Sequence, residues 1–100
     1  MENCPHCERN KKTPRSEEAI KCLLKRLNRI SGQINGVSKM IQENRYCGDV
    51  LVQIAAIESA LKEVGYMVLK DHMESCVSED IKNNDFSSLE EALNIAKKLN

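Results

Sequence analysis

The sequence is poor in bulky apolar residues: among its 100 residues it has no tryptophan and only three aromatic residues, Tyr46, Tyr66 and Phe86. Three aromatic rings are few for a core, and a domain of this length buries a smaller fraction of its unfolded surface than a larger domain does, so we expect the chain to complete its core against a second copy. The sequence also lacks an apolar segment near its N-terminus and any run long enough to span a membrane. We therefore expect a cytoplasmic protein with no membrane partner.

The five cysteines do not suggest a disulfide framework. Their number is odd and no export signal accompanies them. This pattern favours thiol or metal chemistry in a reducing compartment.

The formal net charge is zero, but the charges are unevenly distributed. Residues 1–29 hold eight Lys or Arg and four Asp or Glu, whereas residues 30–100 hold seven and eleven. A neutral chain with this asymmetry can still present a basic face to a polyanion.

No stretch has the alternating pattern of a strand and no repeat is present, so the sequence predicts an all-α fold. Pro14 and Ser16 supply start signals for a first helix over about 15–43. Its apolar positions recur at steps of three and four, as expected for a helix with one buried face: Ile20, Leu23, Leu24, Leu27, Ile30, Ile34, Val37 and Ile41.

The segment NRYCGD interrupts this period, and a second helix is predicted from about 47 to about 78. A loop, KNNDFSS, then precedes a short third helix. Ser87 and Glu90 have the spacing of a capping box at its start.

The stretch DHMESC places His72 and Cys76 four residues apart, and therefore on one face of the second helix. Cys47 comes 25 residues before His72, about 20° short of seven full turns, so it shares that face. However, the rise along the helix separates Cys47 from His72 by roughly 37 Å. Two copies packed antiparallel would bring Cys47 of one to His72 and Cys76 of the other, with a second identical site at the opposite end.

Two thiolates and one imidazole form a soft ligand set, which favours Cu(I), zinc or iron–sulfur over hard cations. Three ligands without an obvious fourth suit a monovalent ion of low coordination number best. The alternative is that Cys47 and Cys76 are buried thiols and His72 a hydrogen-bonded core histidine.

Three segments, RLNRISGQINGVSKMI, RYCGDVLVQIAAIESAL and DHMESC, together resemble the CsoR/RcnR family of bacterial metal-sensing repressors, in particular its copper-sensing branch. The resemblance covers about residues 20–82. It implies a three-helix protomer, an antiparallel four-helix-bundle homodimer, and a homotetramer that is a dimer of dimers. It also implies that the apo form binds operator double-stranded DNA and releases it when Cu(I) binds to Cys47 of one subunit and His72 and Cys76 of the other.

Other branches of the family have a different ligand set, so nickel, cobalt or persulfide sensing on the same scaffold is the alternative effector chemistry.

The resemblance to the copper branch also implies an outer shell around the metal, made by a tyrosine beside the first cysteine and a C-terminal glutamate. Tyr46 matches the tyrosine. Counting without gaps places the glutamate position at Ala92, so either Glu90 or Glu91 has to take that role.

A basic stripe on the first helix is the candidate DNA-binding surface, on the side away from Leu23, Leu27 and Ile34. It consists of Lys21, Lys25, Arg26, Arg29 and Gln33. Such a stripe can follow phosphates, and Gln33 could contact phosphate or base edges. The alternative is a solvated helix face. No helix-turn-helix pattern is present, so recognition would depend on a repeated basic surface and DNA shape.

The N-terminal CPHC, with Cys4, His6 and Cys7, lies outside the family motif. We consider three interpretations of this motif. It is half of an auxiliary zinc or copper site, it is a redox dithiol, or it belongs to a tail of minor function. A redox motif of this kind needs a βαβ scaffold, which the sequence does not predict.

The sequence thus divides into a flexible tail, residues 1–13, and an all-helical metal-sensing and DNA-binding domain, residues 14–100. We expect a repressor and not an enzyme, because no nucleophile and base are paired outside the tail. A copper buffer or carrier without DNA activity is the competing hypothesis.

Overall fold

The computed structural model describes residues 15–100, and within that range it contains helices and no strand. The elements in order are α1 (Glu17–Gln42), α2 (Cys47–His72), the π-helical turn η1 (Met73–Val77), α3 (Ser78–Lys82) and α4 (Ser87–Lys97). Because α2, η1 and α3 follow one another without a break, the described chain has three helical segments. The prediction of an all-α, three-helix protomer is confirmed.

The start of α1 agrees with its sequence signal. Ser16 is the N-cap, and its Oγ accepts a hydrogen bond from the N–H of Ala19 at 3.1 Å. Two acidic residues in the first turn, Glu17 and Glu18, lie favourably against the positive end of the helix dipole. Beyond α1, Asn44 adopts a left-handed conformation with φ of 56° and reverses the chain into α2.

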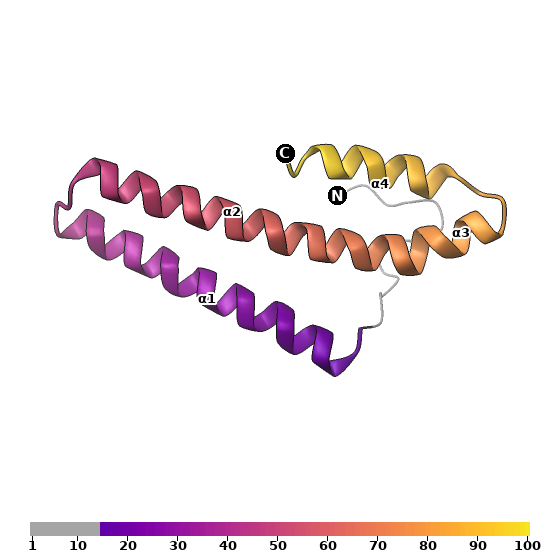
Figure 1. Cartoon of the computed structure of the whole chain (residues 1–100), viewed down its shortest axis with the longest axis horizontal. Coiled ribbons are helices and arrows are strands. Elements are labelled where there is room, and N and C mark those ends of the chain that lie inside the picture. The colour runs from indigo at the N-terminus through magenta and orange to yellow at the C-terminus, as the bar shows by residue number, and fades with distance from the viewer. Residues whose placement is uncertain (1–14) are drawn as a thin grey trace. The chain divides into compact units, whose positions relative to one another are not determined.

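The described residues fall into two compact units, one of residues 16–64 and one of Arg15 with residues 65–100. In the first unit, α1 and the beginning of α2 form an antiparallel hairpin (Figure 1). Its core is small: Ile30 of α1 and Ile57 and Val64 of α2 are buried, with Leu23 and Val37 packed against them.

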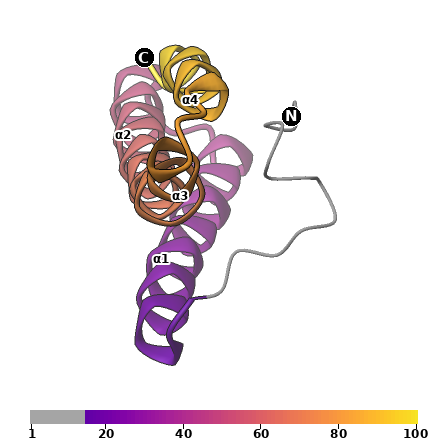
Figure 2. The ribbon, with the colours of Figure 1, turned by 90° about the vertical axis from the view of Figure 1, so that its right-hand side faces the viewer.

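In the second unit, α4 turns back alongside the end of α2 in both views (Figures 1 and 2). Gly65 permits this packing because it has no side chain. A Cβ at this position would lie only 2.7 Å from Cδ2 of Leu99. Val77 and Ala92 are 1% exposed and Ser88 is fully buried, so the core of this unit lies where η1 meets α4.

The start of α4 differs from the prediction. Ser87 is the first residue of the helix, and Phe86 precedes it without a side-chain cap. Asp85 takes the capping role, since its Oδ1 accepts from the N–H of Ser87 at 3.0 Å and from its hydroxyl at 2.6 Å. The predicted Ser87–Glu90 capping box is therefore wrong, and the carboxylate two residues earlier satisfies the free N–H.

Both units leave large apolar side chains exposed. On the hairpin these include Ile20, Leu24, Leu27, Ile34, Ile41, Leu51, Val52 and Leu61. Within residues 15–100, no helix is long and apolar enough to cross a membrane.

Candidate metal centre and nucleic-acid interface

His72 is the last residue of α2, immediately before the π turn. Its ring is half-buried, and its Nε2 atom is buried with no hydrogen-bond partner among the described residues. A buried polar atom without a partner costs about 1–3 kcal/mol, so such an atom calls for an explanation. The ring also borders a cavity of about 410 Å³, which is lined otherwise by Arg15, Gly65, Val68, Leu69, Ile95 and Leu99.

Cys76 lies within the π turn itself, where the N–H of Ser78 bonds to the carbonyl of Met73. Isolated π turns occur frequently at functional sites. Cys76 is 9% exposed, and its Sγ lies 4.0 Å from Oδ2 of Asp80. Its sulfur is in a disulfide in this structure, so a metal ion could bind there only after reduction.

Cys47 is a free, exposed thiol at the beginning of α2, in the hairpin unit. Tyr46 precedes it and starts the helix, because its carbonyl accepts from the N–H groups of Asp49 and Val50. The ring of Tyr46 is 74% exposed and rests against Gly48. One unit therefore contains His72 and Cys76, and the other contains Cys47 and Tyr46.

The two candidate outer-shell glutamates, both on α4, differ in burial. Glu90 is exposed in the first turn of the helix. Glu91 is half-buried, and its Oε1 is buried with no hydrogen-bond partner among the described residues. Glu91 thus shares with His72 the property of an unsatisfied polar atom inside the second unit.

Within residues 15–100, no three His, Cys, Asp or Glu side chains converge on one point of the protomer as metal ligands would. The predicted ligands Cys47, His72 and Cys76 are thus not brought together in a single chain.

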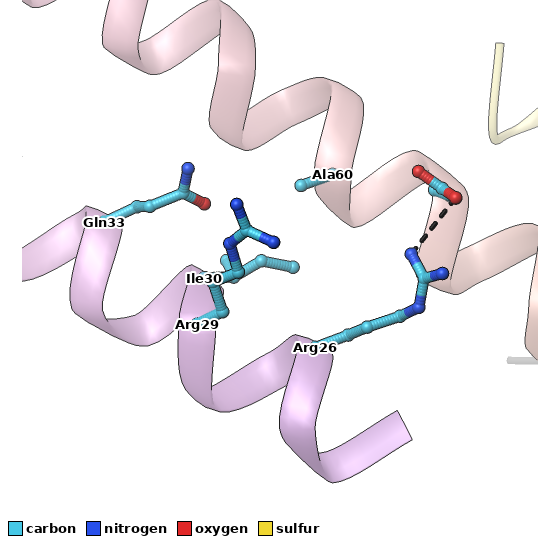
Figure 3. Close-up of a pocket in the computed structure, with 6 residues that line it drawn as sticks. Arg26, Arg29, Ile30, Gln33 and Ala60 are labelled. Carbon is cyan, nitrogen blue, oxygen red and sulfur yellow. Dashed lines mark ion pairs between the residues drawn. The ribbon is translucent and has the colours of Figure 1, made fainter. Parts of the chain in front are cut away.

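Three of the five candidate DNA-binding residues line a cleft of about 190 Å³ between α1 and α2. Arg26, Arg29 and Gln33 extend from α1 towards α2 above the buried Ile30 (Figure 3). Ala60 and Glu63 of α2 form the other side. The cleft is therefore a polar and largely cationic edge of the hairpin.

Arg26 has a partner across this cleft. Its Nη1 donates to Oε1 of Glu63 at 3.1 Å, as the dashed line in Figure 3 marks. A hydrogen bond with the Cys22 side chain and the neighbouring Glu63 carboxylate raise the pKa of Arg26 above its ordinary value.

The remaining two basic candidates, Lys21 and Lys25, are exposed on α1 and do not border the cleft. The predicted stripe is thus divided into a cleft-lining part and a solvent-facing part.

The tail and its candidate auxiliary ligands Cys4, His6 and Cys7 lie outside the described residues, and the zinc prediction there stays a prediction.

Sequence reasoning missed two polar contacts. One is the Arg26–Glu63 pair, and the other joins Nε of Arg15 to Oδ2 of Asp71 at 3.1 Å, next to His72. No spacing rule indicates either pair, because in each case the partners are far apart in the sequence.

The chain is similar to characterised metal sensors. It is 38% identical over 94 residues to the copper-sensing transcriptional repressor CsoR of Bacillus subtilis, covering 93% of this chain and 90% of the relative. The structure of CsoR with Cu(I) from Geobacillus thermodenitrificans matches with a TM-score of 0.78 at 44% identity, over 87% of this chain and 92% of that one. The nickel-responsive regulator InrS matches with a TM-score of 0.64 at 39% identity, over 85% and 92% of the two chains.

Residues 19–98 match the sequence profile of a family described as metal-sensitive transcriptional repressor. The matched segment runs from the first turns of α1 to the end of α4, so it includes every described candidate residue. This match confirms the expectation of a transcriptional repressor rather than an enzyme. The chain belongs to the family of metal-sensitive transcriptional repressors.

Proposed function

We propose that this repressor senses Cu(I): the apo protein binds operator DNA and releases it when Cu(I) binds. The observation that carries the proposal is the buried Nε2 of His72, which has no hydrogen-bond partner among residues 15–100, near a π turn that contains Cys76. A neutral imidazole nitrogen and thiolates form a ligand set of the kind that Cu(I) prefers. The similarity to copper-sensing repressors supports the same effector.

The third ligand in this proposal is Cys47 of a second subunit. Cys47 and His72 are the first and last residues of α2, so a straight 26-residue helix holds them roughly 37 Å apart. Antiparallel packing of two subunits brings the start of one α2 to the end of the other. When bound, Cu(I) would be held by Cys47 of one subunit and by His72 and Cys76 of its mate.

The exposed apolar side chains support a homodimer and a further homotetramer. The hairpin buries only Ile30, Ile57 and Val64, while eleven large apolar side chains of α1 and α2 remain exposed. Burial of that surface favours association, since each Å² of apolar area removed from water contributes about 25 cal/mol before the entropic cost of association is subtracted. Gly32 and Gly36 also have open space above them, which would let another helix approach α1 closely.

Glu91, rather than Glu90, is the carboxylate that completes the outer shell. Metal-bound histidines usually donate their second N–H to a carboxylate or carbonyl. Glu91 has a buried oxygen available for such a bond, whereas Glu90 faces solvent. Tyr46 of the other subunit would join the same network beside Cys47, and this network would transmit metal binding to the DNA-binding helices.

In the apo form, α1 contacts DNA through Lys21, Lys25, Arg26, Arg29 and Gln33. Four copies in a tetramer would present this basic surface repeatedly along a duplex, with affinity arising mainly from phosphate contacts. The site requires reduced thiols, which fits the predicted cytoplasmic location.

The metal proposal is tested on reduced protein by Cu(I) titration with copper X-ray absorption. One three-coordinate site per subunit with two sulfur ligands and one nitrogen ligand is expected. A four-coordinate, oxygen-rich site would contradict the proposal, and a nickel site of higher affinity would favour the alternative that InrS represents.

The DNA proposal is tested by binding of the apo protein to the DNA upstream of its own gene. Specific binding that weakens with salt and is lost on Cu(I) addition is expected. Copper binding without any binding to that DNA would instead favour a copper buffer or carrier.

A further inference from the structure

Glu63 lies on α2, opposite the candidate DNA-binding face of α1, and no sequence motif draws attention to it. Its carboxylate holds the Arg26 guanidinium across the α1–α2 cleft at 3.1 Å (Figure 3). Arg26 is thus already engaged with an anionic group in the protein without DNA. That anionic group is a carboxylate, whose oxygens accept hydrogen bonds from arginine in the same forked geometry as those of a phosphate.

The ion pair is readily exchanged. The Arg26 side chain is 44% exposed and that of Glu63 is 61% exposed. Exposed pairs contribute little to stability, because water and salt screen them and two long side chains must be fixed. A phosphate that approaches this edge of the hairpin can therefore take Arg26 from Glu63 without disturbing the fold.

The surroundings of the pair suit a phosphate better than a carboxylate. Arg29 and Gln33 border the same cleft from α1, so its donors outnumber its single carboxylate. The cleft has a volume of about 190 Å³, which leaves space for phosphate oxygens at its mouth.

We propose that Glu63 is an intramolecular competitor for DNA: its carboxylate occupies, on Arg26, the place that a backbone phosphate takes in the operator complex. This inference rests on the proposed DNA-binding function and adds a residue that limits the affinity. In free protein the Arg26–Glu63 pair is closed. In the complex Arg26 turns to a phosphate and its pair with Glu63 is broken, so the loss of this pair weakens binding and favours release.

Removing the Glu63 charge has two measurable consequences. The slope of log K against log salt concentration becomes steeper by up to about 0.9, the value of one additional net phosphate contact. At 1 M salt, where phosphate contacts contribute nothing in this relation, the variant and the wild type should bind equally. At 0.15 M salt the steeper slope then makes the variant bind about fivefold more tightly, because 0.15 raised to the power −0.9 is about 5.5. Since phosphate contacts carry no sequence information, the gain is equal on operator and unrelated DNA.

The test uses the full-length, reduced apo protein and fluorescence anisotropy with two duplexes of equal length, the operator and a scrambled sequence. Affinities are measured between 50 and 300 mM salt for wild type, Glu63→Gln, Arg26→Gln and the double variant. Glu58→Gln is the matched control, because Glu58 is an exposed acidic residue of the same helix that does not border the cleft. Glu63→Ala repeats the charge removal with a different side chain.

The expected result is a steeper slope and an approximately fivefold gain for Glu63→Gln and Glu63→Ala, no comparable gain for Glu58→Gln, and no gain when Glu63→Gln is added to Arg26→Gln. Weaker binding or an unchanged slope in Glu63→Gln would overturn the inference while leaving the proposed function intact. An equal gain in Glu58→Gln would also overturn it, since the effect would then be one of net charge. If wild-type apo protein binds neither duplex, the proposed function itself fails, and the inference fails with it.

Discussion

Replacement of His72 by alanine separates metal capture from release of DNA. Nε2 of His72 is buried and has no hydrogen-bond partner within the described part of the chain, at a cost of about 1–3 kcal/mol to the apo protein. Truncation removes this cost together with the packing of a ring that borders a cavity of about 410 Å³. The two effects oppose each other, so we expect the free energy of unfolding of apo protein to change by less than about 1 kcal/mol, below the 2–5 kcal/mol of typical core truncations.

The functional change should be much larger. Allosteric coupling between two ligands is typically about 1–3 kcal/mol, a 5- to 150-fold change in affinity. Cys47 and Cys76 can hold Cu(I) as two thiolates, so His72→Ala should retain most of the copper affinity and apo DNA binding. The Cu(I)-driven loss of DNA affinity should fall below about twofold, because the connection from the metal through the imidazole to Glu91 is absent.

The assay is DNA binding by anisotropy with and without stoichiometric Cu(I), together with urea unfolding of reduced apo protein. Val68→Ala is the matched control, since it lines the same cavity without a ligand atom and should keep the full copper response. If His72→Ala is released by Cu(I) as wild type is, the coupling model is wrong. A loss of 3 kcal/mol or more in apo stability would instead identify His72 as a packed core residue.

Three further changes test the remaining parts of the site and fold. Cys47→Ser should abolish Cu(I) binding and release while leaving apo DNA affinity intact, because this thiol is exposed and contributes no packing; retained copper affinity in a competition titration would exclude Cys47 as a ligand. Glu91→Gln should reduce the Cu(I)-driven change in DNA affinity at least fivefold, whereas Glu90→Gln should not, and the reverse order would assign the outer shell to Glu90. Ser16→Ala should lower the free energy of unfolding by about 1 kcal/mol in urea, because the N–H of Ala19 loses its acceptor, and a change of only a few tenths would show that water replaces it.

Much of the local structure could be read from the sequence. The three- and four-residue period of apolar side chains gave α1 to within two residues, and Ser16 caps it as expected. The second helix was predicted to end near residue 78, whereas helical structure continues through the π turn to Lys82. A π turn has no sequence signal of its own, because it depends on how neighbouring elements pack, here η1 against α4.

The candidate ligands could also be chosen from the sequence, since face and spacing follow from helix geometry alone. Periodicity predicted Cys47, His72 and Cys76 on one face, and the length of the helix means that a site made of all three would need a second chain. The choice between Glu90 and Glu91 could not be made in this way. Adjacent helical residues point about 100° apart, and only the packing of α4 determines which one is buried.

The pairing of Arg26 with Glu63 depends entirely on tertiary structure. The sequence assigns both residues to polar helix faces and contains nothing that relates their positions. The register between α1 and α2 is set by the packing of Ile30 against Ile57 and Val64, and this register brings the guanidinium to the carboxylate. The sequence by itself thus determined the helices and the types of candidate ligand, because both follow from local periodicity and side-chain chemistry. The tertiary structure decided which polar groups are buried, paired or left without a partner, because those properties depend on contacts between residues distant in the chain.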